Sequence, residues 1–231
     1  MRLKRAKRVP DPMSSSPRSA EETAIAELRR EYRFGTLSER DIQEDPLQQF
    51  RRWFAEAERA QVLDYSAMAL ATSQAGVPSA RIVLLKGLDE DGFRWFTDGR
   101  SEKGQALAEN PQAELLFHWR ELDRQVRVRG DVTRVSDSES DAYFYSRPLD
   151  SQLAAATSEQ SQPVDSREAL EQRYRTLTDS FPEQAPRPRA WGGYCLKPAQ
   201  YEFWQGREGR LHDRLQYRLA ISGWVVERLQ P

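Results

Sequence analysis

Residues 67–97 read AMALATSQAGVPSARIVLLKGLDEDGFRWFT, and this stretch indicates the fold class. It contains short runs of strand-forming composition at Ala67–Ser73, Ala80–Gly87 and Gly92–Thr97. Between the last two runs, Asp91-Gly92 is expected to supply the positive φ angles of a tight hairpin turn. Short strands joined by tight turns pair side by side, so the stretch predicts antiparallel strands.

Strand-like runs continue through the rest of the chain. In Arg124–Val135, the apolar Val126 and Val128 alternate with polar residues, so this strand has one apolar and one polar face. The polar face could be exposed to solvent or could line a site. Other expected strands are Ala113–Trp119, Trp191–Leu196, Gln200–Gln205, Arg210–Leu219 and Trp224–Leu229. Short strands at this spacing favour an antiparallel barrel over a doubly wound parallel sheet.

Helical patterns interrupt these strands. Asp45 is a suitable N-cap, Pro46 fits the first helical position, and Leu47, Phe50 and Phe54 share one face. Further helices are expected from Ser19 to Gly35, over Ser101–Asn110 and within residues 137–180. We therefore expect an α+β fold, mainly antiparallel β, with helices packed outside the sheet.

Composition limits the class of protein. The chain has 231 residues and a formal net charge of −1, and it contains no apolar run long enough to span a membrane. Residues 1–20 are basic and rich in Ser and Pro, which predicts a disordered tail before a single domain at residues 21–231. With only Cys195, His118 and His212, one chain offers no Cys/His zinc cluster and no disulfide framework, so we expect no metal and a cytoplasmic setting.

The charged residues raise the question of an anionic partner. Of the 35 Lys and Arg residues five are lysines, leaving 30 arginines, which genomic base composition could explain. Neither of the glycine-rich phosphate-binding motifs occurs, so any bound phosphate must be held mainly by side chains. Removing Met1–Pro12, with a net charge of +4, leaves −5 for the remainder, which argues against nucleic acid as a partner.

Two groups of residues could bind phosphate. Arg81 and Lys86 lie five residues apart on an expected strand, so they point to opposite faces unless the strand twists or ends between them. Tyr143, Arg147 and Ser151 have the i, i+4, i+8 spacing that would align a phenol, a guanidinium and a hydroxyl on one helix, although Pro148 tends to break it. A guanidinium with neutral hydroxyl donors suits a phosphate dianion, but a surface helix with a paired arginine would have the same pattern.

A third group lies near the C-terminus. Arg210, His212 and Arg214 alternate along an expected strand and should project from one face. Such cationic crowding calls for an anion or a carboxylate opposite, so His212 is a stronger site candidate than an isolated histidine would be.

Several motifs together resemble one enzyme family. They are Arg81–Lys86, Ser101–Lys103, Arg124-Gln125-Val126, Ser146-Arg147-Pro148, Asp150-Ser151-Gln152, Gln160-Ser161, Trp191-Gly192-Gly193, Glu202–Gly206 and Arg210–Arg214. In this order, from about Leu28 to the C-terminus, the chain resembles the pyridoxamine (pyridoxine) 5′-phosphate oxidases. The resemblance implies a split β-barrel homodimer with FMN at the subunit interface. It also implies oxidation of pyridoxamine or pyridoxine 5′-phosphate to pyridoxal 5′-phosphate, with O2 reduced to H2O2.

The resemblance assigns roles by position. The residues that match FMN-contacting positions are Arg81, Ile82, Val83, Leu84, Leu85, Lys86, Phe96, Thr97, Lys103, Gln125, Gln160, Ser161, Trp204 and Arg214. Those that match the substrate-phosphate set are Lys86, Tyr143, Arg147 and Ser151, while Arg29 and Tyr32 match a segment that can close over the site. Arg210 and His212 match positions over the substrate ring and are the expected catalytic residues, with the choice of base between them left open.

The sequence departs from the family pattern beside Lys103. Glu102 stands where a second basic residue is common, so Arg100 substitutes for it, Glu102 turns outward, or flavin binding is weaker. Phe96 replaces a common tyrosine, a milder change because a backbone contact would survive. The alternatives to the oxidase are another split-barrel flavoprotein reductase and a non-catalytic FMN- or pyridoxal-phosphate-binding protein.

Overall fold

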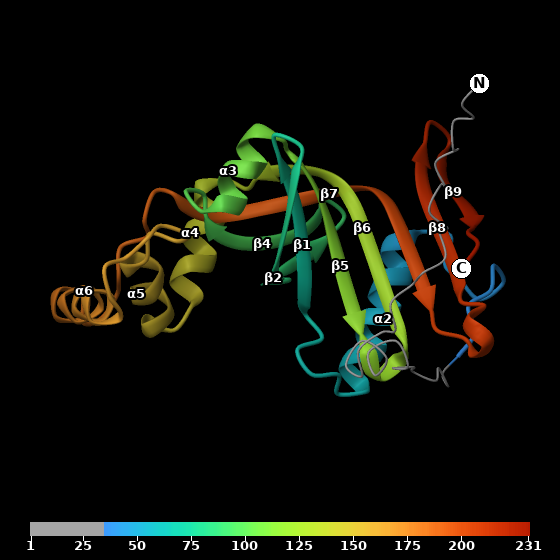
Figure 1. Ribbon diagram of the computed structural model, residues 1–231, viewed down its shortest axis with the longest axis horizontal. Helices are drawn as coiled ribbons and strands as arrows, with labels where there is room; N and C mark the ends of the chain where they lie inside the picture. The colour runs from blue at the N-terminus through green and yellow to red at the C-terminus, as the bar shows by residue number, and fades with distance from the viewer. Residues whose placement is uncertain (1–34) are drawn as a thin grey trace, which may run out of the picture. The chain divides into compact units, whose positions relative to one another are not determined.

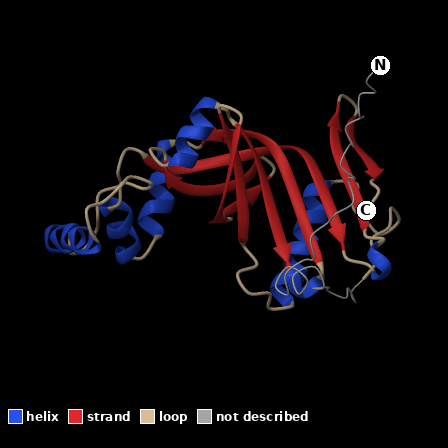
Figure 2. Cartoon of the chain, in the orientation of Figure 1, coloured by secondary structure: helices blue, strands red, loops and turns tan. Residues whose placement is uncertain are grey.

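The computed structural model describes residues 35–231, and an antiparallel sheet forms its centre (Figures 1 and 2). The strands are β1 (Ala67–Gln74), β2 (Val77–Leu84), β3 (Gly87–Asp89), β4 (Gly92–Asp98), β5 (Gln112–Trp119), β6 (Arg124–Arg134), β7 (Trp191–Gln205), β8 (Asp213–Ala220) and β9 (Gly223–Arg228). The order is β2-β1-β5-β6-β7-β4-β3, and β8 and β9 extend from β7. Because β2 and β3, at the two ends of this order, do not pair, the described barrel is open, and the predicted mainly antiparallel split barrel is confirmed.

Strand β7 connects the two sides of the barrel. The expected strands Trp191–Leu196 and Gln200–Gln205 are one strand of 15 residues, whose first part pairs with β4 and whose last part pairs with β8. β6 runs along both parts, and its register shifts between Arg129 and Gly130. A Cβ atom on Gly130 would lie 1.9 Å from the carbonyl oxygen of Lys197, so this close approach requires glycine.

The expected strand Ala80–Gly87 is wrong at its C-terminal end. β2 stops at Leu84, after which Leu85 N–H donates to Ser66 O at 2.9 Å and Lys86 N–H donates to Arg94 O at 2.8 Å. The chain therefore changes neighbours between Leu85 and Lys86, from the β1 side of the open barrel to the β4 side. A single sequence run could not show this change, because both sides accept residues of the same composition.

Tight turns join the first strands. Ala75 and Gly76 have φ angles of 48° and 79° and form the two-residue turn between β1 and β2. At the turn between β3 and β4, only Gly92 has a positive φ, at 133°, so the expectation of positive angles at both Asp91 and Gly92 is wrong. The sequence signal still marked the correct turn.

The described helices are α2 (Pro46–Arg59), α3 (Glu102–Glu109), α4 (Asp137–Ser146), α5 (Leu149–Thr157) and α6 (Arg167–Ser180). The predicted start of α2 is confirmed, since Asp45 Oδ1 accepts the N–H of Leu47 at 2.9 Å. Phe50 on this helix is fully buried, with ring centroids 4.8 Å from Phe93 and 4.9 Å from Phe117. Replacing a buried Phe with Ala destabilises a protein by about 3–5 kcal/mol, so this contact is a major part of the core.

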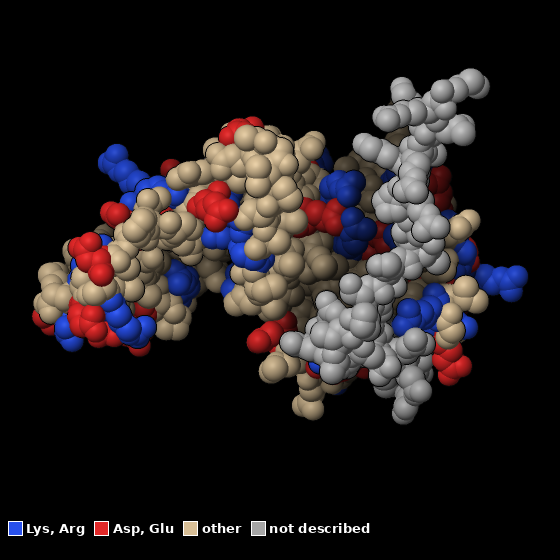
Figure 3. All heavy atoms as spheres, in the orientation of Figure 1, with Lys and Arg blue, Asp and Glu red and all other residues tan. Residues whose placement is uncertain are grey.

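Helices α4, α5 and α6 lie at one end of the sheet and the β8–β9 hairpin at the other (Figure 1). On the face seen in Figure 3, basic and acidic side chains of the described residues are interspersed. Within residues 35–231, no helix is both long and apolar enough to cross a membrane. The expected tail, the domain boundary at residue 21 and the helix that begins near Ser19 lie outside the described residues and stay predictions.

Candidate active site

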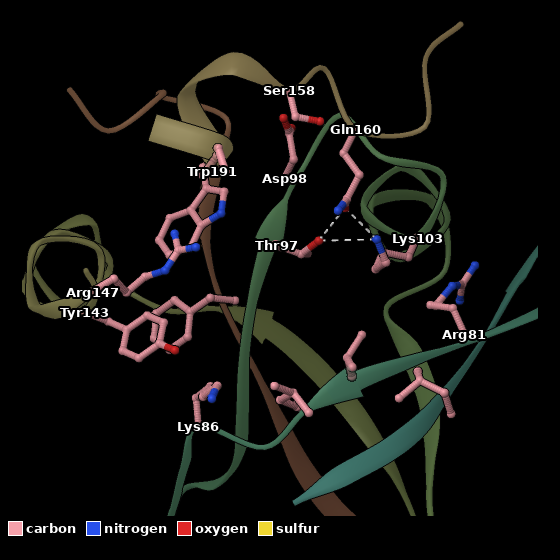
Figure 4. A pocket seen from close by; sticks show the side chains of 16 residues that line it. Arg81, Lys86, Thr97, Asp98, Lys103, Tyr143, Arg147, Ser158, Gln160 and Trp191 are labelled. Atoms are coloured by element: carbon pink, nitrogen blue, oxygen red, sulfur yellow. Dashed lines mark hydrogen bonds between the residues drawn. The ribbon is translucent and has the colours of Figure 1, made fainter. Parts of the chain in front are cut away.

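A cavity of about 460 Å³ opens between β2, β4, α4 and α5 (Figure 4). The predicted site residues that line it are Arg81, Ile82, Val83, Leu84, Lys86, Phe96, Thr97, Lys103, Tyr143, Arg147 and Gln160. Arg81 and Lys86 both line the cavity because β2 ends between them. On one continuous strand, two residues at this spacing would have pointed to opposite faces. The sequence therefore identified most of the polar wall of this cavity.

Lys103 is a buried cation at one side of the cavity. Its Nζ lies 2.6 Å from Gln160 Oε1 and 3.3 Å from Thr97 Oγ1 (Figure 4), and 3.4 Å from Ser101 Oγ. Burial, and then the nearby Arg81, lowers the pKa of Lys103, and its side chain forms no ion pair within residues 35–231. A buried ammonium with only neutral acceptors fits a phosphate group, whose negative charge would compensate it.

Arg81 reaches the cavity from the edge strand β2. Its Nη1 donates to Thr72 Oγ1 and its Nη2 to Ser79 Oγ, both at 2.7 Å, which fixes the plane of the guanidinium. Burial lowers the pKa of Arg81, while the nearby Glu102 opposes this shift. Arg81 is thus held in place by neutral acceptors, as a preorganised anion ligand would be.

Glu102, the departure from the family pattern, turns away from the cavity. Its Oε1 accepts the hydroxyl of Ser79 at 3.0 Å, and the residue does not line the cavity. Arg100 does not take the place of a second basic residue, because its Nη2 pairs with Asp98 Oδ2 at 2.7 Å and the side chain lies outside the lining. Among the three alternatives, the geometry corresponds to an outward-turned Glu102.

Arg147 is a half-buried cation that also lines the cavity. The helix does break before Pro148, so Arg147 is the extended residue after α4, and Ser151 in α5 does not line the cavity. The Arg147 guanidinium lies over the Trp191 ring at 5.0 Å, and its buried Nη1 has no hydrogen-bond partner within residues 35–231. Burial lowers the pKa of Arg147, so this group also suits an anion.

Aromatic rings form the wall beside Arg147. The ring of Tyr143 stacks on Phe96 at 3.9 Å between centroids and is nearly parallel to Trp191, at an interplanar angle of 5°. Burial raises the pKa of Tyr143, so its hydroxyl stays protonated and can donate a hydrogen bond. Sequence reasoning did not place Trp191 in the site, although the Trp191-Gly192-Gly193 motif was a usable signal. It also missed Asp98, Ala154, Ala155 and Ser158.

A second group of predicted residues lies at the far end of β7. Gln125, Trp204 and Arg214 are register partners on β6, β7 and β8, so they form a row across three strands. Arg214 Nε donates to the buried Glu202 at 2.9 Å. None of these residues, nor Arg210 or His212, lines the cavity.

The expected strand Arg210–Leu219 is wrong at its start. Gly209 and Arg210 have φ angles of 64° and 62°, and β8 begins only at Asp213, so Arg210 and His212 do not alternate with Arg214 on one strand face. Instead, His212 Nδ1 accepts the backbone N–H of Arg207 at 3.1 Å, which closes a turn. Burial, and then Arg210, lowers the pKa of His212, and a neutral ring bonded in this way carries its proton on Nε2.

Five predicted residues belong to neither group, and one of them is Ser151, described above. Leu85 is 8% exposed and belongs to the hydrophobic core, and Ser161 is exposed with a φ angle of 71°. Arg29 and Tyr32 lie outside the described residues.

The open antiparallel barrel, with a cavity lined by the buried Lys103 and the half-buried Arg147, defines a protein of the split-barrel class. Two family models match the chain: Pyridoxamine 5′-phosphate oxidase over residues 54–180, and Pyridoxine 5′-phosphate oxidase C-terminal dimerisation region over residues 191–231. The chain belongs to the pyridoxamine 5′-phosphate oxidase family.

Relatives of high identity support this assignment. The pyridoxine/pyridoxamine 5′-phosphate oxidase of Cupriavidus taiwanensis is 56% identical over 211 residues, covering 90% of this chain and 100% of the relative. That of Polynucleobacter asymbioticus is 53% identical over 209 residues, covering 90% of this chain and 99% of the relative.

Solved structures share the fold. PhzG from Burkholderia lata, in complex with tetrahydrophenazine-1-carboxylic acid, has a TM-score of 0.81 and 32% identity over 86% of this chain and 99% of that chain. An FMN-binding protein from Nostoc punctiforme, related to pyridoxamine 5′-phosphate oxidase, has a TM-score of 0.65 and 22% identity over 82% of this chain and 100% of that chain.

Proposed function

We infer that this protein is an FMN-dependent oxidase that converts pyridoxamine or pyridoxine 5′-phosphate to pyridoxal 5′-phosphate, with O2 reduced to H2O2. The observation that carries this inference is a single cavity with two separate cations, the buried Lys103 and the half-buried Arg147, in a chain of this family. Two cation sites suit a reaction in which both the cofactor and the substrate carry a phosphate.

The residues around Lys103 fit the phosphate of FMN. The ammonium is buried without an ion-pair partner in the described residues, and Thr97 and Gln160 lie within hydrogen-bond distance of it. Arg81 provides a second, preorganised cation on the same side (Figure 4). FMN held there would supply the redox chemistry of the reaction, with two electrons of the substrate passing to O2.

The residues around Arg147 fit the phosphate of the substrate. The Nη1 of Arg147, which has no hydrogen-bond partner among residues 35–231, and the protonated hydroxyl of Tyr143 are donors, and Lys86 adds a cation to the same lining. Phosphate bound by an arginine in charge-assisted hydrogen bonds fixes both the position and the orientation of the substrate. Ser151, at the start of α5, is a less direct candidate because it does not line the cavity.

We propose that each site is completed by a second copy of the chain. The matched dimerisation region, residues 191–231, contains Trp204, Arg210, His212 and Arg214, which do not line the cavity of their own chain. In a twofold dimer these residues of each chain would complete the partner's cavity, with FMN at the interface. Their cationic groups would then face the bound phosphates and rings rather than one another.

The turn at His212 suggests how it acts. Because Nδ1 accepts the Arg207 N–H, a neutral His212 offers a proton from Nε2, and taking a proton on Nδ1 would break the turn hydrogen bond. We propose that His212 orients the substrate as a donor through Nε2, with Arg210 as the adjacent cation. Since the pKa of His212 is lowered by burial and Arg210, the ring stays neutral at physiological pH.

Oxygen uptake by FMN-loaded protein, with each phosphorylated substrate and with unphosphorylated pyridoxine as control, tests the function. We expect uptake with equal formation of H2O2 and pyridoxal 5′-phosphate, and little with the control. Flavin-containing protein that consumes no oxygen would support a non-catalytic carrier. Turnover of a reduced phenazine carboxylate but not of the phosphates would support a PhzG-like activity instead.

Subunit complementation tests the shared site. R147A and H212A damage opposite halves of the proposed site, so a mixed dimer retains one intact site. Random mixing gives half mixed dimers, so we expect recovery of about one quarter of wild-type activity. No recovery in verified mixed dimers would place both residues in the site of one chain.

We also propose that the enzyme works in the cytoplasm. The support is chemical: Cys195 is the only cysteine and is a buried free thiol, which suits a reducing compartment.

A further inference from the structure

Arg187 forms an unusually complete set of bonds outside the cavity. It lies in the loop before β7, and its side chain is only 9% exposed. Its Nε pairs with Asp141 Oδ1 at 2.5 Å, its Nη2 with Asp137 Oδ1 at 3.0 Å, and its Nη1 donates to the carbonyl oxygen of Trp191 at 2.6 Å. The guanidinium therefore joins one face of α4 to the first residue of β7.

The positive charge of Arg187 is stabilised by the two aspartates of this junction. Burial opposes the charged form, but hydrogen bonds with Asp141 and Asp137 outweigh it and raise the pKa of Arg187. Arg187 does not line the cavity, so it cannot contact a ligand there directly. Any effect it has on the site must pass through the groups that it holds.

Those groups build the wall around Arg147. α4 leads directly into Arg147, whose guanidinium lies 5.0 Å from the centroid of Trp191 and 5.7 Å from that of Phe144. Its buried Nη1 has no hydrogen-bond partner among residues 35–231. Ring contacts are weaker and less directional than hydrogen bonds, so the guanidinium position depends on how Trp191 is set against α4.

Other contacts keep α4 in place without Arg187. The buried Ser140 Oγ accepts the backbone N–H of Gly193 at 3.2 Å, and Glu139 pairs with Arg94 Nε at 2.9 Å. These bonds hold the first turn of α4 to β7 and β4. Losing Arg187 should therefore loosen the contact between α4 and Trp191 without detaching the helix.

We propose that Arg187 is a positioning residue that sets Trp191 against α4 and thereby orients the Arg147 guanidinium for the substrate phosphate. This rests on the proposed role of Arg147. Arginine is suited to the task because its planar group reaches two carboxylates and one carbonyl at once, which the single ammonium of lysine cannot do.

The test compares steady-state kinetics of R187A, R187K and the control R167A in FMN-loaded protein. R167A removes an arginine that pairs with Glu171 on α6 and is 83% exposed, so its kinetics should match the wild type. R187A should raise KM for pyridoxamine 5′-phosphate on the order of tenfold, with a smaller change in kcat and an unchanged flavin content. R187K, which keeps the charge between the two aspartates, should lie between R187A and the wild type.

A double-mutant cycle with R147A separates this proposal from the proposed function. If Arg187 acts through Arg147, R187A should have no further effect on KM in the R147A background. If the increases in KM caused by R187A and R147A multiply in the double variant, the positioning role is overturned, while Arg147 remains the phosphate ligand. An unchanged KM in R147A alone would instead overturn the proposed role of Arg147. Should R187A not fold, R187K in the same cycle decides between these outcomes.

Discussion

Replacing Lys103 with Met should change cofactor affinity and protein stability in opposite directions. Methionine has a similar length but no charge, so K103M removes the ammonium from beside Gln160, Thr97 and Ser101. The acceptors keep other partners: Thr97 Oγ1 still donates to Gln160 Oε1 at 2.8 Å, and Ser101 Oγ still bonds Asp98 O. The substitution is therefore selective for the charge.

The magnitude for FMN follows from one lost charge-assisted hydrogen bond. Such bonds contribute about 1.5–3 kcal/mol, so Kd for FMN should rise about 10- to 150-fold. In the cofactor-free protein K103M should instead be stabilising. Burial lowers the pKa of Lys103 and so disfavours its charged form in the folded state. Relief of that penalty should raise Tm at pH 7.

Fluorescence quenching of FMN measures Kd, and thermal unfolding of the cofactor-free protein measures Tm. Because the folded-state pKa is lowered, the Tm difference should shrink as pH rises toward the unfolded lysine pKa of about 10.4. The control K197M removes an exposed lysine on β7 and should change neither quantity. A wild-type Kd in K103M would refute the assignment of Lys103 to the phosphate.

The remaining predictions concern charges nearer the surface. E102Q should tighten FMN binding severalfold, since Glu102 places a negative charge near Arg81 and Lys103, and weaker binding in a titration would mean that its bond to Ser79 matters more. Glu39, whose pKa the Arg228 guanidinium lowers to about 2, should stabilise the protein above its unfolded pKa of about 4.3 and lose this effect as pH falls toward 2. E39Q should reduce the change with pH in the free energy of unfolding, measured with urea, over this pH range. The same pH dependence in E39Q and the wild type would contradict the pairing. H212A should reduce turnover more than flavin content, and unchanged turnover would remove His212 from the mechanism.

Local signals were sufficient where neighbouring residues determine the structure. The start of α2 follows from Asp45 and Pro46, and the start of α3 from Ser101, whose Oγ accepts the Gly104 N–H at 3.3 Å. Val126 and Val128 are fully buried, as their alternation predicted. In each case the deciding interaction spans only a few residues.

Sequence reasoning failed where a backbone conformation depends on distant packing. Ala75 adopts a positive φ in the β1–β2 turn although alanine gives no turn signal, and Arg210 adopts one where an unbroken strand was expected. The continuous β7 was predicted as two strands, Trp191–Leu196 and Gln200–Gln205. There β6 shifts register at Gly130 and keeps pairing with both sides of this segment.

The sequence alone determined the family, the antiparallel class and most of the residues of the cavity, because motifs and strand composition are local properties of the chain. The tertiary structure decided which of the predicted site residues line the cavity and which lie away from it. It brings Arg147 against Trp191, 44 positions later in the chain, and it leaves Trp204, His212 and Arg214 away from the cavity. The physical reason is the path of β7, which pairs with β4 at its start and with β8 at its end, and so carries the two groups to opposite ends of one strand.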